Sequence, residues 1–61
     1  MKILTIKEVI SMTSLSRSTL YVMINEGSFP KPLKLHERKI GWLPADIEEW
    51  ISKLQRVEYI A

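Results

Sequence analysis

The sequence predicts one mainly α-helical domain with a small β-hairpin, in the order helix, helix, hairpin, helix. In three separate segments, apolar residues recur three and four positions apart, as they do on one face of a helix. A short segment between the second and third of these alternates apolar and polar residues, as strands do. The 61 residues leave room for one small core, so residues 1–61 are expected to form a single domain.

The first helix is expected to begin directly after Thr5. Thr5 and Glu8 stand three residues apart, as in a capping box, where each side chain accepts a hydrogen bond from the other residue's backbone N–H. The pattern breaks after two turns, so the helix is predicted to end near Ser11 or Met12. Its apolar stripe consists of Ile6, Val9 and Ile10.

The second helix is predicted over residues 16–25. Ser16 is a favoured N-cap residue because its hydroxyl can accept a hydrogen bond from an otherwise unpaired backbone N–H. Gly27 supplies the left-handed conformation that commonly ends a helix. Pro30 and Pro32 then hold the chain extended. The stripe facing the core consists of Leu20, Met23 and Ile24.

Residues 33–42 predict a short antiparallel hairpin. Leu33-Lys34-Leu35 and Lys39-Ile40-Gly41-Trp42 alternate apolar and polar side chains on either side of His36-Glu37-Arg38. The tip lacks the Asn-Gly or Asp-Gly pair that marks a tight two-residue turn, so the sequence leaves the form of this loop open.

The third helix is expected to begin at Pro44, since proline suits the first helical position. The acidic residues near its positive end are Asp46, Glu48 and Glu49. The stripe that should close the core consists of Ile47, Trp50, Ile51 and Leu54. Trp42 and Trp50 each lie on an apolar stripe, which favours a core role over base stacking. The sequence leaves open whether Val57, Tyr59 and Ile60 continue this helix or form a tail.

Composition argues against several classes of protein. The chain has no cysteine and one histidine, His36, so neither a metal site nor a cofactor is expected. The longest apolar run, residues 20–24, is far shorter than the roughly 20 residues that cross a bilayer. The acidic residues of the third helix are explained by the helix dipole, and no nucleophile–base pair or glycine-rich phosphate loop accompanies them. An enzyme is therefore not expected, and the protein is expected in the cytoplasm.

Charge is distributed unevenly along the chain. The net charge is only +2, but residues 16–42 contain five basic and two acidic side chains, whereas residues 43–61 contain two basic and four acidic ones. This distribution can present an attractive face to phosphates while the rest of the chain stays acidic. Accidental scatter is the alternative interpretation.

Two short helices joined by a tight turn and followed by a basic hairpin form a winged helix-turn-helix, a geometry suited to a DNA groove. At about 100° per residue, an inward Leu20 directs four second-helix residues outward. Arg17 and Thr19 lie in the first turn, where Arg17 can pair with a guanine edge or a phosphate. The outward residues are Ser18, Tyr21, Val22 and Asn25.

Each contact candidate also has a structural interpretation. Ser18 and Thr19 can satisfy first-turn backbone groups, and Tyr21 can pack on the flank of the helix. In the hairpin, Arg38 and Lys39 can reach the DNA backbone or minor groove. The candidates for further phosphate contacts are Lys31 and Lys34. Ordinary solvation of a hairpin edge is the alternative for these basic residues.

Three segments resemble the AlpA family of phage and prophage regulators: Leu15-Ser16-Arg17-Ser18-Thr19-Leu20-Tyr21, Glu26-Gly27-Ser28-Phe29-Pro30-Lys31-Pro32, and Gly41-Trp42. The resemblance implies a winged helix-turn-helix related to MerR-type domains and to excisionases. Arg17, Ser18, Thr19 and Tyr21 match the recognition helix of the family, and Arg38 matches its basic wing residue.

The chain departs from the family pattern at three places. Val22 stands where arginine is frequent, and Ser14 stands where a turn glycine is frequent. His36-Glu37 occupies the place of common wing glycines.

Three functions follow as hypotheses. The first is a sequence-specific transcriptional regulator of a prophage or mobile element, acting on an integrase or excision gene. The second is an excisionase-like factor that bends attachment-site DNA together with an integrase. The third is a protein-interaction module that keeps the fold without binding DNA. The expected partners are double-stranded DNA at the nucleoid, an integrase or RNA polymerase, and a second copy of the chain.

Overall fold

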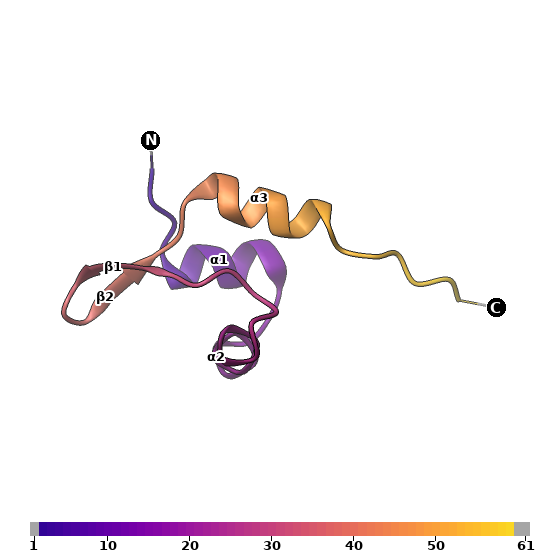
Figure 1. The fold of residues 1–61 in the computed structure, drawn as a ribbon, viewed down its shortest axis with the longest axis horizontal. Helices are drawn as coiled ribbons and strands as arrows, with labels where there is room; N and C mark the ends of the chain where they lie inside the picture. Colours follow the sequence, from indigo (N-terminus) through magenta and orange to yellow (C-terminus); the bar gives the residue numbers. More distant parts are fainter. Residues whose placement is uncertain (1, 60–61) are drawn as a thin grey trace.

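The computed structural model describes residues 2–59, and Figure 1 shows their arrangement. In this view α1 lies between α3 and α2, the hairpin projects to one side, and the chain after α3 runs away on the other. The predicted order of helix, helix, hairpin and helix is confirmed. The elements are α1 (Ile6–Thr13), α2 (Arg17–Glu26), β1 (Leu33–His36), β2 (Lys39–Gly41) and α3 (Pro44–Ser52).

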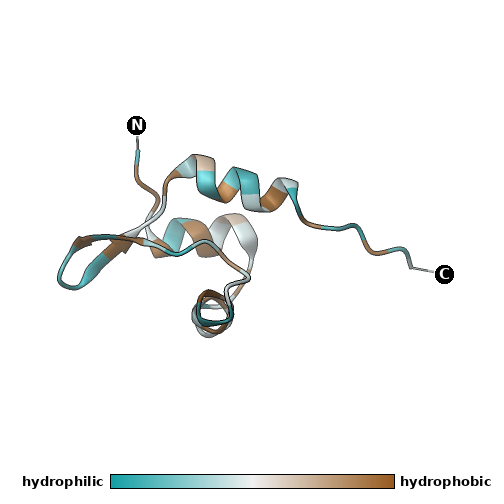
Figure 2. Cartoon of the chain, in the orientation of Figure 1, coloured by the Kyte–Doolittle hydropathy of each residue, from teal (hydrophilic) through white to brown (hydrophobic). Residues whose placement is uncertain are grey.

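A core of five buried side chains joins these elements. α1, α2 and α3 contribute one residue each, and the other two come from the α2–β1 connection and from the position after β2. Figure 2 shows that hydrophobic and hydrophilic residues alternate along α1 and α3, as expected for helices with one buried face. The buried residues are Val9, Leu20, Phe29, Trp42 and Ile47.

The capping box at the start of α1 is confirmed. The Thr5 N–H donates to Glu8 Oε1 over 3.1 Å, and the Glu8 N–H donates to Thr5 Oγ1 over 3.2 Å. Lys2 Nζ lies 2.7 Å from the other oxygen of the same carboxylate. The hydrogen bonds from Lys2 and then from the Thr5 backbone hold the pKa of Glu8 below its ordinary value. The charged form of Glu8 therefore caps this helix.

The first helix ends at Thr13, slightly beyond the predicted end at Ser11 or Met12. The Thr13 hydroxyl donates to the carbonyl of Val9 over 2.8 Å, which keeps Thr13 within the last turn. Ser14 then adopts the left-handed conformation, with φ of 62°, and its N–H donates to the Ile10 carbonyl. The turn between the two helices therefore depends on a conformation that favours glycine.

Replacing Ser14 with glycine is expected to stabilise the domain by about 0.5–1 kcal/mol, because glycine adopts this conformation without the steric cost of a Cβ. In a domain of this size the melting temperature should rise by roughly 2–8 °C, as measured by circular dichroism. Ser14→Ala is the matched control, since alanine keeps the Cβ and should not stabilise the protein. An equal gain in both variants would contradict this explanation.

The predicted hairpin is present, with Leu33 opposite Gly41 and His36 opposite Lys39. Its loop is therefore the two-residue turn Glu37–Arg38, which the sequence had left open, and the register shifts between Lys34 and His36. The second strand was predicted to include Trp42, but it ends at Gly41.

The strand ends earlier because of a pairing that no local sequence pattern predicts. Trp42 pairs with Leu4 instead of with the first strand of the hairpin. The Leu4 N–H donates to the Trp42 carbonyl over 2.8 Å, and the Trp42 N–H donates back over 3.0 Å. A Cβ at Gly41 would lie 2.5 Å from Cγ2 of Ile3, so this close approach requires glycine.

The prediction that the apolar stripe of the third helix closes the core as far as Leu54 is wrong. The helix ends at Ser52, and the Lys53 N–H is shared between the carbonyls of Glu49 and Trp50, each 3.2 Å away. Ile47 is buried, and Trp50 is partly buried against the core. The two outer members of the predicted stripe, Ile51 and Leu54, are 42% and 54% exposed and do not close the core.

The chain after α3 forms an extended tail rather than further helix. Val57 and Tyr59 are 70% and 89% exposed, while Ile60 lies outside the described residues. None of the helices described between residues 2 and 59 has the length and apolar character needed to cross a membrane.

Candidate nucleic-acid interface

The outward face of α2 is the first part of the candidate interface. Leu20 is fully buried, and Met23 and Ile24 pack against the core. This arrangement fixes the rotation of the helix about its axis and confirms the predicted direction of its outward face. Tyr21 and Val22 are 43% and 55% exposed. The exposed residues of this outward face are Ser18, Tyr21, Val22 and Asn25.

The first turn of α2 combines a cap with an exposed cation. Ser16 Oγ accepts from the Thr19 N–H over 3.1 Å, and its hydroxyl donates to Thr19 Oγ1 over 2.9 Å. Ser16 is therefore the predicted N-cap, and it also orients the Thr19 hydroxyl. Arg17 is exposed beside this cap. Neither of the ion pairs found within residues 2–59 involves the Arg17 guanidinium.

The hairpin forms the second part. Lys34 lies on β1, Arg38 in the two-residue turn, and Lys39 at the start of β2. Lys31 precedes the hairpin in the connection from α2. All four side chains are exposed, and the ion pairs of the described chain leave them free for an external anion.

Two tryptophans fix the connection between α2 and the hairpin. Trp42 Nε1 donates to the Pro30 carbonyl over 2.8 Å, and Trp50 Nε1 donates to the Ser28 carbonyl over the same distance. The Phe29 ring lies edge-on to both indoles, with centroids 6.1 Å from Trp42 and 4.7 Å from Trp50. The outward face of α2 and the basic hairpin are therefore joined through a packed aromatic cluster, defined here as Phe29, Trp42 and Trp50.

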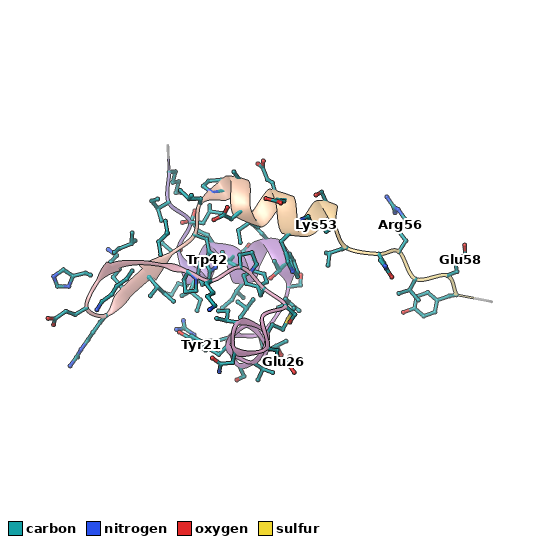
Figure 3. All side chains as sticks on the ribbon, viewed as in Figure 1. Tyr21, Glu26, Trp42, Lys53, Arg56 and Glu58 are labelled. Atoms are coloured by element: carbon teal, nitrogen blue, oxygen red, sulfur yellow. The ribbon has the colours of Figure 1, made fainter. Side chains whose placement is uncertain are left out.

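One residue of α2 can be placed relative to the hairpin. In Figure 3, Tyr21 lies on the side of α2 toward which the hairpin extends, whereas Glu26 lies on the opposite side. Lys53, Arg56 and Glu58 follow α3 and the tail, away from the hairpin. Tyr21 is thus the labelled candidate of α2 on the hairpin side, while Lys34, Arg38 and Lys39 lie in the hairpin itself.

Acidic side chains of α3 lie beside the start of the connection that follows α2. Within residues 2–59 no three side chains of His, Cys, Asp or Glu come together in a group that could hold a metal ion. The acidic residues Asp46 and Glu49 border an open hollow of about 290 Å³ together with Trp50 and Lys53. Lys53 Nζ lies 2.9 Å from the Glu49 carboxylate, so the charges in this hollow are partly paired.

Two residues that position the interface were missed by sequence reasoning. The sequence patterns give Phe29 no place in the core, although it is buried. Its sequence signal was a lone large apolar side chain between Gly27 and Pro30. Leu4 was given no role, although it stands just before the Thr5 cap, where a hydrophobic staple places an apolar residue.

Residues 2–57 match the family described as prophage CP4-57 regulatory protein (AlpA). The chain is 34% identical over 58 residues to the DNA-binding transcriptional activator AlpA of Escherichia coli (strain K12), covering 85% of this chain and 83% of that protein. It is 33% identical over 51 residues to the uncharacterized protein ORF88 of Enterobacteria phage P4, covering 84% of this chain and 58% of the phage protein. With its three helices and hairpin in the order of a winged helix-turn-helix, the chain belongs to the AlpA family of prophage regulatory proteins.

Proposed function

We propose that this protein binds a specific sequence in double-stranded DNA and regulates transcription in a prophage or mobile element. The outward face of α2 enters the major groove, and the hairpin contacts the adjacent backbone or minor groove. The observation that carries the proposal is an exposed face of α2 joined to an exposed basic hairpin through a connection that two indole hydrogen bonds anchor to the core. The name of the Escherichia coli relative, a DNA-binding transcriptional activator, supports it.

The roles of the contact residues follow from their positions. Arg17, Ser18, Thr19 and Tyr21 occupy the end and side of α2 that approach the groove first. Thr19 still has a hydroxyl proton to donate after accepting from Ser16. The phosphate contacts are assigned to Lys31, Lys34, Arg38 and Lys39.

We propose an integrase or excision gene as the regulated target. Selection of genomic DNA fragments with the purified protein tests this proposal, because enrichment of promoter fragments supports transcriptional control. Enrichment of tandem sites in an attachment region, with excision lost when the gene is deleted, would instead support the architectural role beside an integrase. Recovery of no DNA fragment would overturn both and leave the protein-interaction module.

Arg17→Ala is expected to weaken binding to the selected duplex by about 1–3 kcal/mol if Arg17 contacts a base. The matched control is Arg56→Ala, because Arg56 is equally an exposed arginine but lies on the tail. Fluorescence anisotropy on selected and scrambled duplexes separates the two possible contacts. A base contact predicts a loss confined to the selected duplex, whereas a phosphate contact predicts an equal loss on both. Unchanged affinity on both duplexes would contradict a role for Arg17.

We also propose that two copies act together on DNA, since one small domain covers only a short site. The exposed apolar side chains of the tail, Val57 and Tyr59, are the surface that supports this. The tail leaves α3 beside an apolar groove of about 450 Å³, which Met23, Ile51 and Leu54 help to line. Sedimentation of the protein with and without its selected duplex measures the stoichiometry. A single copy on every selected site would contradict it.

A further inference from the structure

The outward face of α2 contains an apolar side chain that does not pack in the core. Val22 is 55% exposed, although Leu20 on the same helix is completely buried. Valine is a poorer helix former than alanine, arginine or lysine, so the position gains nothing for helix stability. The two methyl groups of Val22 therefore form an apolar spot on an otherwise polar face made by Ser18 and Asn25.

Asn25 lies one turn further along the same face. It is exposed, and its amide takes part in no side-chain hydrogen bond found within residues 2–59. A helix rises about 1.5 Å per residue, so Val22 and Asn25 are separated by about 4.5 Å along the axis. Successive base pairs are about 3.4 Å apart, so the two side chains can contact the same base pair or neighbouring ones.

The chemistry of this pair of side chains matches one kind of base pair. In the major groove an A·T pair presents the adenine N7 acceptor and N6 donor together with the thymine C5-methyl group. An asparagine amide can bond to both adenine groups, and an apolar side chain can cover the methyl group. A G·C pair offers no methyl group to Val22.

We propose that Val22 contacts the C5-methyl group of a thymine and that Asn25 pairs with an adenine, so that this part of α2 selects A·T base pairs. The inference rests on the proposed function and names what the helix reads. It assigns thymine recognition to a side chain that makes no hydrogen bond, and it therefore predicts sensitivity to the removal of a single methyl group from the DNA.

The test replaces each thymine of the selected duplex, one at a time, with deoxyuridine, which lacks only that methyl group. For the unmodified protein, one substitution is expected to weaken binding by about fourfold, the value of one buried methyl-sized group. In Val22→Ala the difference between thymine and uracil at that position should disappear. Alanine is a strong helix former, so this variant is expected to stay folded.

Glu26→Ala is the control, because Glu26 is an exposed residue of the same helix that lies on the side opposite Tyr21. This control should keep the full fourfold sensitivity at the same thymine. Equal affinity for thymine and uracil duplexes at every position, or an undiminished difference in Val22→Ala, would overturn the inference while leaving DNA binding intact. Failure to bind any duplex would overturn the proposed function and the inference together.

Discussion

Trp42→Ala is expected to unfold the domain at room temperature. Trp42 is fully buried, packs edge-on to Phe29 and donates to the Pro30 carbonyl. Removal of a buried tryptophan costs about 3–5 kcal/mol. A core of this size supplies only about 3–5 kcal/mol in total, so the loss consumes most or all of the stability. Far-ultraviolet circular dichroism and a thermal scan should show no cooperative transition.

Two variants make this expectation specific. Tyr59→Ala removes an aromatic ring that is 89% exposed and should leave the melting temperature unchanged. Trp42→Phe keeps an aromatic ring but removes the N–H, so the Pro30 carbonyl loses its partner at a cost of about 1–3 kcal/mol. A cooperative melt of Trp42→Ala at the temperature of the unmodified protein would contradict the central role of this residue.

The second large effect concerns salt. Raising monovalent salt from 50 to 200 mM is expected to weaken DNA binding by roughly a hundredfold, because about four phosphate contacts release their counterions. The contacts are assigned to the four free cations of the hairpin and its connection, Lys31, Lys34, Arg38 and Lys39. Anisotropy titrations at several salt concentrations give the slope of log affinity against log salt.

The chain provides its own control for this slope. The side chains of Lys2 and Lys53 are 75% and 73% exposed but already pair with Glu8 and Glu49. Replacing both with glutamine should leave the slope unchanged, whereas replacing Lys34 and Lys39 should reduce it by about two. An affinity that does not respond to salt would contradict DNA binding through these residues.

Much of this fold could be predicted because its signals are local. The Thr5–Glu8 capping box, the Ser16 cap and Gly27 with φ of 80° each act within a few residues. The outward direction of Val22 follows equally from its distance to Leu20. These residues depend on helix geometry alone, which the sequence encodes in its periodicity.

One error came from an interaction between distant residues, and another came from the end of a helix. The pairing of Leu4 with Trp42 joins segments 38 residues apart, and no local sequence pattern predicts it. The apolar stripe of α3 continues in the sequence to Leu54, but the helix ends where its last carbonyls share the Lys53 N–H. Ile51 and Leu54 then lie beside an open groove because no further element of the described chain covers them.

The hydrogen bonds from the two indoles to Ser28 and Pro30 have a consequence for how a complex would form. They favour a set spacing between α2 and the hairpin, because the aromatic cluster ties the connection between these elements to the core. Such a preorganised surface loses little conformational entropy on binding. A set spacing also favours deformation of the DNA over adjustment of the protein where the groove width does not match. Flexible base steps at the right positions would then favour a site as much as the bases that the helix touches.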